Sequence, residues 1–387
     1  MTLIECLDRQ PIRNIAGCLE LKPRKLVLLG DGKELDDAGK RCRELLKNTD
    51  TTVFTEPVDI NDRTSVEASL QKILDREDDC VIDVTGGAEA FLLAVGAVSA
   101  TRGEQLKLHT ADLYSAPLTV SELIRLHGGK IHPKSMQPAM TAKASDLKAI
   151  WELSCRDPRE WNRRVGILKE FESRSRDKEE IDLQVSDLEK EINGFFQKEF
   201  VVRNLVDMLS TAGVVEDRSS FSRIRYTYTD PLLHDCMKQE GKLLELKTLL
   251  EARACAEEGK AWFGAALMGV TIDWDGEISK PREKKPETRN EVDVMVTRGM
   301  VPMFISCKNG TVDENELYKL NTVAERFGSG YAKKMLVVSR LDMGGESSNA
   351  SFAKRAEDME VYLVPNAAEL SSKQWHRVLK EAMEKVW

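Results

Sequence analysis

The residues best suited to chemistry lie close together, between Glu291 and Lys308. Two apolar runs with alternating side chains flank a short turn at Gly299, which is typical of a β-hairpin. Because side chains alternate between the faces of a strand, Glu291 and Asp293 share one face of the first strand. Ser306 and Lys308 share one face of the second strand for the same reason. Carboxylates opposite a lysine can hold Mg²⁺ or Mn²⁺ and a phosphodiester together, although charges on the wet side of a surface hairpin would show the same spacing.

Elements able to position these residues surround the hairpin. The sequence predicts a long amphipathic helix and a strand before it, over 232–257 and 265–274. After it we expect a helix, two strands and a C-terminal helix, over 313–327, 334–339, 361–364 and 367–385. Strands interleaved with helices in this way predict an α/β/α layer.

The hairpin and the elements after it resemble the core of the PD-(D/E)xK nuclease superfamily, in which one acid precedes a strand that ends in acid-x-lysine. Asp293 and Lys308 match this pattern. Ser306 departs from it because it stands where the second acid would be, which makes Glu291 the candidate for the missing carboxylate. The run Gly241–Glu245 also resembles the opening of the first helix of that core, whose glutamate reaches the metal.

The resemblance implies a metal-dependent nuclease site. Asp293, Glu245 and the backbone carbonyl of Cys307 would bind Mn²⁺ or Mg²⁺, and Lys308 would align or deprotonate the attacking water. Glu245 has a simpler alternative as part of a solvated helix side, because Lys247 follows it closely.

The first third of the chain repeats strand and helix patterns. Strand-like apolar runs lie at 2–7, 25–29, 51–55, 80–84 and 106–110, with helix-forming segments at 13–21, 35–46, 65–74 and 88–100. Strands separated by helices predict a parallel, doubly wound, Rossmann-like sheet. Ligands of such sheets bind at the carboxyl ends of the strands, near the point where the strand order reverses.

Two polar loops follow strands of this predicted sheet. One contains Arg9, Gln10 and Asn14, and the other is Thr85-Gly86-Gly87. Paired glycines at a strand-to-helix turn let backbone N–H groups approach an anion, although such glycines often only turn the chain. The run Gly30-Asp31-Gly32 lacks the third glycine of a dinucleotide fingerprint, so a nicotinamide cofactor is not expected.

The order of elements and the two loops resemble a CARF domain, the cyclic-oligoadenylate sensor of type III CRISPR ancillary proteins, over about residues 1–130. The resemblance implies that the two loops bind a cyclic oligoadenylate activator, with cyclic tetra-adenylate as the expected form and ring size left open. That family often has a small residue and a lysine after Thr-Gly-Gly, whereas this chain has Ala88-Glu89. Because a carboxylate there would repel phosphate, the contact usually made by the lysine is not carried over.

The region between these two parts is less specific. A polar, irregular stretch over 128–146 is interpreted as a linker, and the charged segments over 173–191 are expected to be helical. A helix over 201–212 followed by strands near 214–216 and 223–228 predicts the end of a winged helix, which either reads DNA or serves as a spacer or dimer contact. The basic cluster over 280–285 could contact a phosphate backbone or be an ordinary loop.

Composition limits the classes of function. A chain of 387 residues predicts two or three domains, and its formal net charge of −8 provides no global positive field for nucleic acid. The 8 cysteines contain no Cys-x-x-Cys pair and the 5 histidines are dispersed, so neither a zinc site nor histidine catalysis is expected. Without an apolar run of 18 residues or a leader, we expect a soluble cytoplasmic protein with no membrane partner.

Together, the two resemblances match the layout of the CRISPR ancillary nucleases called Card or Can proteins. We expect a sensor domain over 1–130, a linker and winged-helix-like region over 131–235 and a nuclease domain over 236–387. This layout implies a homodimer that binds one cyclic oligoadenylate and then cleaves single-stranded RNA or DNA, or nicks DNA. A non-catalytic, cyclic-nucleotide-responsive DNA-binding regulator is the alternative, supported by Ser306 and the winged-helix pattern.

Overall fold

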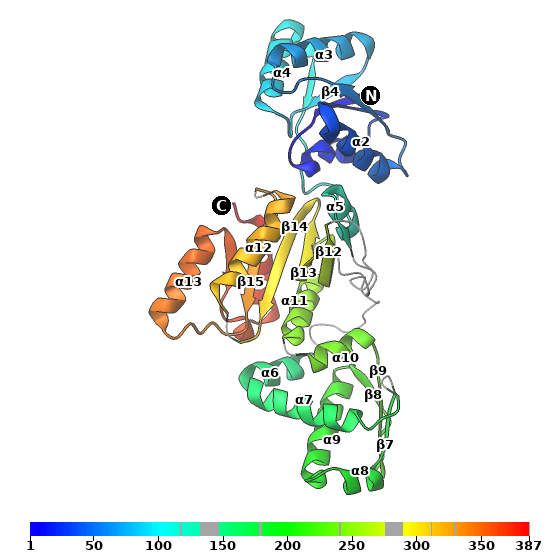
Figure 1. Cartoon of the computed structure of the whole chain (residues 1–387), viewed down its shortest axis with the longest axis vertical. Coiled ribbons are helices and arrows are strands. Elements are labelled where there is room, and N and C mark those ends of the chain that lie inside the picture. Colours follow the sequence, from blue (N-terminus) through cyan, green and yellow to red (C-terminus); the bar gives the residue numbers. More distant parts are fainter. Residues whose placement is uncertain are drawn as a thin grey trace.

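The computed structural model describes residues 1–116, 118–131, 147–177, 180–239, 241–274, 289–310, 312–328 and 330–386. These residues form three units that lie in a row (Figure 1). The N-terminal unit occupies one end, the unit that follows it in sequence occupies the other end, and the C-terminal unit lies between them. The order of the units in space therefore differs from their order along the chain.

The N-terminal unit is built on a parallel sheet of 5 strands in the order β3-β2-β1-β4-β5. Its strands are β1 (Thr2–Cys6), β2 (Lys25–Gly30), β3 (Thr52–Pro57), β4 (Cys80–Asp83) and β5 (Lys107–His109). Each strand begins and ends within two residues of the run expected from the sequence. The strand order reverses between β1 and β4, so the expectation of a parallel, Rossmann-like sheet is confirmed.

Helices cover both faces of this sheet. They are α1 (Ala16–Leu21), α2 (Gly32–Leu46), α3 (Arg63–Arg76) and α4 (Glu89–Arg102). Leu3 packs in the same apolar cluster as Cys18 and Cys42 of α1 and α2, whereas its neighbour Ile4 packs with α3 and α4. A strand buried on both faces is apolar at successive positions, which explains the continuous apolar runs of the sequence.

The unit at the opposite end combines helices with a three-stranded antiparallel sheet of order β7-β9-β8. Its elements are α6 (Lys148–Arg156), α7 (Pro158–Glu172), β7 (Glu180–Gln184), α8 (Val185–Glu191), α9 (Phe195–Thr211), β8 (Val215–Asp217), β9 (Arg223–Tyr228) and α10 (Pro231–Lys238). The expectation that residues 173–191 are wholly helical is wrong, because β7 lies within them. Its Ile181 and Leu183 are buried and alternate with polar residues, a period of two that favours a strand.

The C-terminal unit contains a six-stranded sheet of order β16-β15-β14-β13-β12-β6. The strands are β6 (Lys130–Ile131), β12 (Ala265–Asp273), β13 (Arg289–Arg298), β14 (Val301–Lys308), β15 (Lys333–Val338) and β16 (Val361–Val364). Strands β13 and β14 form the expected antiparallel hairpin, and β14, β15 and β16 run parallel. Strand β6 pairs with β12, so the end of the expected first domain contributes to this sheet instead.

Helices enclose this sheet in an α/β/α arrangement. Helices α11 (Lys242–Ala254) and α14 (Ser372–Glu384) pack on one face, and α5 (Val120–Leu126), α12 (Glu314–Phe327) and α13 (Glu346–Asp358) on the other. A small hairpin, β10 (Ala256–Glu257) and β11 (Lys260–Ala261), follows α11. The expectation of a single helix over 232–257 is wrong. The helix is interrupted between α10 (Pro231–Lys238) and α11, where Gly241 adopts a φ of +85°.

The N-terminal and C-terminal units touch through specific contacts. The Arg13 guanidinium donates a hydrogen bond to the Tyr331 hydroxyl and lies 4.8 Å from the centre of its ring. On the hairpin turn, the Met300 N–H donates to the Leu113 carbonyl at 2.8 Å. Gly299 has a φ of +58°, and a Cβ there would lie 2.5 Å from the same carbonyl oxygen, so the close approach requires glycine. Within the described ranges, no helix is both long and apolar enough to cross a membrane.

Candidate active site

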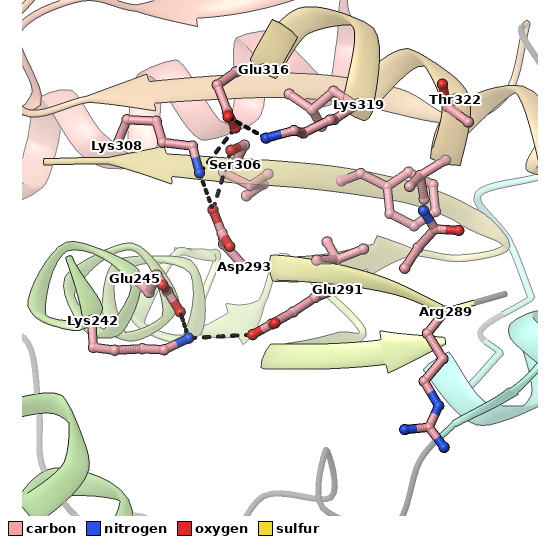
Figure 2. Close-up of a pocket in the computed structure, with 16 residues that line it drawn as sticks. Lys242, Glu245, Arg289, Glu291, Asp293, Ser306, Lys308, Glu316, Lys319 and Thr322 are labelled. Carbon is pink, nitrogen blue, oxygen red and sulfur yellow. Dashed lines mark hydrogen bonds and ion pairs between the residues drawn. The ribbon is translucent and has the colours of Figure 1, made fainter. Parts of the chain in front are cut away.

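A cavity of about 530 Å³ opens where β13 begins and β14 ends. Side chains from α11, β13, β14 and α12 line it, and most of its labelled polar groups face one another (Figure 2). The ionisable residues of the lining are Lys242, Glu245, Arg289, Glu291, Asp293, Lys308, Glu316 and Lys319. The cavity therefore combines four carboxylates with cations from several elements.

Asp293 lies at the centre of this group. Its Oδ2 accepts hydrogen bonds from the Cys307 backbone N–H at 2.7 Å and the Ser306 hydroxyl at 3.2 Å. The same oxygen lies 3.7 Å from the Lys308 ammonium. Because β13 and β14 pair directly, the hairpin register brings Asp293 opposite these residues. The structure thus places Asp293 beside Ser306 and Lys308, as the sequence predicted.

The Lys308 ammonium has a second carboxylate partner that the sequence analysis did not identify. Glu316 in the first turn of α12 lies 3.0 Å from it, and Lys319 approaches the same carboxylate at 2.7 Å from the outer side. Asp313 caps the helix by accepting the Asn315 N–H at 2.9 Å. Burial alone would lower the pKa of Lys308, but the neighbouring carboxylates raise it above the ordinary value, so this lysine stays charged.

A separate group of charges gathers around Lys242, which the sequence analysis also missed. Its ammonium lies 2.7 Å from Glu245 and 3.6 Å from Glu291. The pKa of Glu245 is raised to about 7, because burial, together with repulsion by Asp293 and Glu291, outweighs the hydrogen bond from Lys242. Glu245 is buried, which contradicts the alternative that it belongs to a solvated helix side.

These donors suit a hard divalent cation. Mg²⁺ and Mn²⁺ prefer oxygen ligands, and Glu245, Asp293 and Glu316 present carboxylate oxygens to one cavity. The raised pKa of Glu245 shows that its negative charge is costly where it lies, and a bound cation would relieve that cost. In the described part of the chain, no three acid, histidine or cysteine groups converge closely enough to hold a metal, and ammonium groups lie between the acids.

The remaining residues predicted for this site differ in their position relative to the cavity. The Cys307 thiol donates to the Thr248 hydroxyl at 3.5 Å, away from the cavity, so only the backbone of Cys307 is suited to bind a ligand there. Glu291 lines the cavity, but 62% of its side chain is exposed. The basic cluster over 280–285 lies outside the described residues.

The two predicted sensor loops meet at the carboxyl ends of β1 and β4. Asp8 connects them, because its Oδ2 accepts the Gly87 N–H at 2.9 Å and lies 3.2 Å from Arg13 Nη1. A Cβ added to Gly86 would lie 2.7 Å from the Cβ of Arg13, so the second loop passes directly against the first. The side chain of Gln10 packs against Gly328, at the end of α12, where an added Cβ would overlap it.

Individual residues of these loops differ in how accessible they are. Arg9 is exposed, whereas Asn14 is buried and its side-chain amide exchanges hydrogen bonds of 2.6 and 2.9 Å with the Asp8 backbone. The Thr85 hydroxyl accepts the Ala111 N–H at 2.7 Å. Asn14 and Thr85 therefore hold the two loops in shape.

The sequence contains weak indications that Lys242 and Glu316 lie at the cavity. Lys242 directly follows the glycine that starts α11, and Glu316 lies in the first turn of the helix after β14. Both positions are also common for ordinary surface charges, since the first turn of a helix favours acids and helix surfaces favour mixed charge. Only the packing of the helices against the hairpin distinguishes them.

No family model and no curated protein matches this sequence. Among solved structures, the chain resembles Can2 from Sulfobacillus thermosulfidooxidans in complex with cyclic tetra-adenylate, with a TM-score of 0.63 and 15% identity over 99% of both chains. Protein VC1899 from Vibrio cholerae gives a TM-score of 0.66 at 15% identity, over 99% of this chain and 97% of that one. A type III CRISPR defence DNA nuclease activated by cyclic oligoadenylate gives 0.51 at 15% identity, over 100% of this chain and 52% of that one. Over nearly its whole length, the chain therefore shares the fold of Can2 and VC1899.

Proposed function

We propose that this protein is a metal-dependent nuclease of type III CRISPR defence, activated by a cyclic oligoadenylate. The observation that carries the proposal is the cavity at the hairpin, where Asp293, Glu245 and Lys308 face a common space. The fold shared with Can2, which was solved with cyclic tetra-adenylate, supports the sensor part of the proposal. The substrate is a phosphodiester in single-stranded RNA or DNA, or in a DNA duplex that is nicked.

The catalytic residues have distinct roles in this proposal. Asp293, Glu245 and the backbone carbonyl of Cys307 would hold Mn²⁺ or Mg²⁺, with Glu291 as a further acid at the open side. A bound divalent cation polarises the phosphoryl oxygen and lowers the pKa of water. Lys308, held charged between two carboxylates, offsets the negative charge that develops on the phosphate and aligns the attacking water.

The activator would bind at the loops that end β1 and β4. Arg9, Gln10, Asn14 and Thr85-Gly86-Gly87 surround this edge of the parallel sheet, where ligands of doubly wound folds bind. The glycines let the two loops pass directly against each other at this edge, beside Arg13. Contacts of Gln10 and Arg13 with Gly328 and Tyr331 offer a route from this pocket to the nuclease unit.

A homodimer completes the sensor in this proposal. Leu92 and Leu93 of α4 have 47% and 64% of their surfaces exposed, and Leu108 on the edge strand β5 has 50% exposed. Apolar side chains beside an unpaired strand edge favour association with a second copy. A two-fold axis there would let one cyclic ligand use each loop twice, so we expect one ring per dimer.

The unit formed by α6 to α10 serves as a spacer in this proposal. Its order of α7, β7, α8, α9, β8 and β9, with β9 between the other strands, supports a winged-helix arrangement. Arg203 of α9 holds the turn between β8 and β9 by donating to the carbonyls of Ser220 and Phe221 at 3.0 and 3.2 Å. A winged helix also suits the alternative function, a DNA-binding regulator without catalysis.

Metal-dependent cleavage of labelled RNA and DNA distinguishes these two functions. The protein is incubated with single-stranded RNA, single-stranded DNA and supercoiled DNA in Mn²⁺, with and without cyclic tetra-adenylate. The proposed nuclease cleaves at least one substrate when activator and metal are both present. Retarded but intact DNA under all conditions would support the regulator and contradict the nuclease.

A further inference from the structure

The carboxylate of Asp8 occupies an anion-binding position at the carboxyl ends of β1 and β4. Its Oδ2 accepts the Gly87 N–H at 2.9 Å and lies 3.2 Å from Arg13 Nη1. We propose that the Gly87 N–H and the Arg13 guanidinium form a phosphate-binding cradle, and that Asp8 competes with phosphate for it. This inference rests on the proposed binding of a cyclic oligoadenylate and identifies the groups of the chain that receive its phosphate.

The two donors of the cradle suit a phosphate group. A guanidinium presents its N–H groups in a planar fork that matches the oxygens of a carboxylate or of a phosphate. Gly87 lies two residues before α4, and the start of a helix favours negative charge through its backbone N–H groups and its dipole. A carboxylate and a phosphate therefore compete for the same donors.

Close packing fixes both donors in place. A Cβ added to Gly86 would lie 2.7 Å from the Cβ of Arg13, so the second loop contacts the stem of this side chain. Gly87 has a φ of +107°, and a Cβ there would lie 2.7 Å from Cδ1 of Phe91, so the direction of its N–H depends on glycine. Donors that are held in this way need little ordering when an anion binds.

The shape of the first loop does not depend on the charge of Asp8. Its backbone N–H donates to Asn14 Oδ1 at 2.6 Å, and its carbonyl accepts the Asn14 side-chain amide at 2.9 Å. A substitution of the Asp8 side chain keeps both of these main-chain contacts. Oδ1 of Asp8 accepts the Gln10 N–H at 2.7 Å, and the oxygen of an asparagine can do the same. Asp8→Asn therefore removes the charge from the cradle and retains the loop.

Competition by Asp8 lowers the apparent affinity for phosphate. The Asp8 side chain is only 10% exposed, whereas that of Arg13 is 33% exposed. When a phosphate takes over Arg13, the carboxylate loses its cation where water reaches it poorly, and the two anions repel each other. The apparent affinity falls with the fraction of molecules in which the cradle is free of Asp8. Asp8 therefore raises the activator concentration at which the sensor responds.

A structural brace is the rival interpretation of the same contacts, and it predicts a different result. If Asp8 and Arg13 only hold the two loops together, removing either partner loosens the pocket and weakens ligand binding. If Asp8 competes with phosphate, removing Asp8 strengthens binding, whereas removing Arg13 weakens it. The signs of the two effects therefore distinguish competition from bracing.

Calorimetric titration of the full-length protein with cyclic tetra-adenylate, without divalent metal, measures both signs. The variants are Asp8→Asn, Arg13→Gln and Asp31→Asn. Asp31 is the matched control, because it directly follows β2 at the same edge of the sheet and its side chain is exposed. We expect Asp8→Asn to bind about tenfold more tightly and Arg13→Gln about tenfold more weakly, as for one hydrogen bond to a charged group. Asp31→Asn should stay within about twofold of the parent, because salt screens an exposed charge.

Inorganic phosphate, observed by phosphorus NMR, tests the cradle without assuming the activator. Asp8→Asn should bind phosphate more tightly than the parent protein does. Adding Arg13→Gln to this variant should cancel the gain, because the cradle then lacks its cation. Thermal unfolding of each variant checks that the fold is intact.

The possible results are distinguishable. Unchanged or weaker ligand binding by Asp8→Asn, at an unchanged unfolding temperature, would overturn the competition. Equal tightening by Asp31→Asn would also overturn it, because the effect would then be one of net charge. If cyclic tetra-adenylate binds neither parent nor variant, but Asp8→Asn binds phosphate through Arg13, the cradle is supported and the proposed activator is wrong. If neither probe binds any of the proteins, the cradle and the activator are both wrong.

Discussion

The contact between Arg13 and Tyr331 provides a test of communication between the two proposed functions. Arg13 belongs to the loop after β1, and Tyr331 lies in the segment between α12 and β15 of the C-terminal unit. The Arg13 guanidinium contacts the Tyr331 hydroxyl and the Asp8 carboxylate. A phosphate of the activator would compete with Tyr331 for the Arg13 guanidinium. The free energy of activator binding should therefore be less favourable by the free energy of the lost hydrogen bond to the Tyr331 hydroxyl.

Tyr331→Phe removes only that hydroxyl and keeps the ring over which the guanidinium lies at 4.8 Å. A buried hydrogen bond to a charged group contributes about 1.5–3 kcal/mol, and the partial exposure of Arg13 reduces this to about 1 kcal/mol. Release of about 1 kcal/mol corresponds to about a fivefold change in an equilibrium constant. We therefore expect half-maximal activation at about a fivefold lower activator concentration.

The assay is the initial rate of substrate cleavage against the concentration of cyclic tetra-adenylate, at fixed Mn²⁺. Tyr362→Phe is a suitable control, because that hydroxyl bonds Glu381 at 2.7 Å within the C-terminal unit. An unchanged or higher half-maximal concentration for Tyr331→Phe would refute the idea that this contact opposes activation.

Three further expectations follow from other parts of the molecule. Burial lowers the pKa of His127 to about 4, whereas the unfolded chain titrates near 6.5, so the unfolded state binds more protons as pH falls between these values. Stability should drop by up to about 3 kcal/mol over that window, and urea unfolding of His127→Phe should show a weaker pH dependence. Leu93→Glu should yield a folded monomer by sedimentation, since 64% of this residue is exposed, and a dimer as stable as the parent's would place the interface elsewhere. Gly86→Val should abolish activator binding by calorimetry through overlap with Arg13, and unchanged binding would move the pocket away from these loops.

The N-terminal sheet was predictable because its central strands β2, β1 and β4 are buried on both faces, and because helices of ordinary length separate the strands. Each such strand is a continuous apolar run, which the sequence displays directly. Strand β6 was not predictable, because Lys130–Ile131 is only 2 residues long and gains its partner from β12, more than a hundred residues later. Its place depends on tertiary pairing that leaves no periodic pattern.

The helix is interrupted at Gly241, a residue type that often ends helices, but the apolar periodicity of the sequence continues across it. Apolar residues continue at helical spacing on both sides of the glycine, so the pattern predicts one helix where the structure has α10 and α11. The positive φ of Gly241 ends that continuity and turns the start of α11 toward the cavity. As a result, Lys242 and Glu245 lie together in the first turn, where they bond at 2.7 Å.

For the candidate site, the hairpin spacing was enough to group Asp293, Ser306 and Lys308, because a strand pair has a fixed side-chain period. Glu316 and Lys242 could not be found in this way. Their approach to the hairpin depends on how α12 and α11 pack on opposite faces of the sheet. Residues contributed by packed helices follow no short motif.

The most direct test of the proposed function compares the parent protein with Asp293→Asn, in Mn²⁺, with and without cyclic tetra-adenylate. Asparagine retains an oxygen that can accept the Cys307 N–H, so the hairpin should stay folded while the central charge is lost. We predict that the activated parent cleaves labelled single-stranded RNA or DNA and that Asp293→Asn is slower by at least about 10²–10³-fold. Equal cleavage by both proteins, each with an unchanged unfolding temperature, would contradict the assignment of this cavity as the active site.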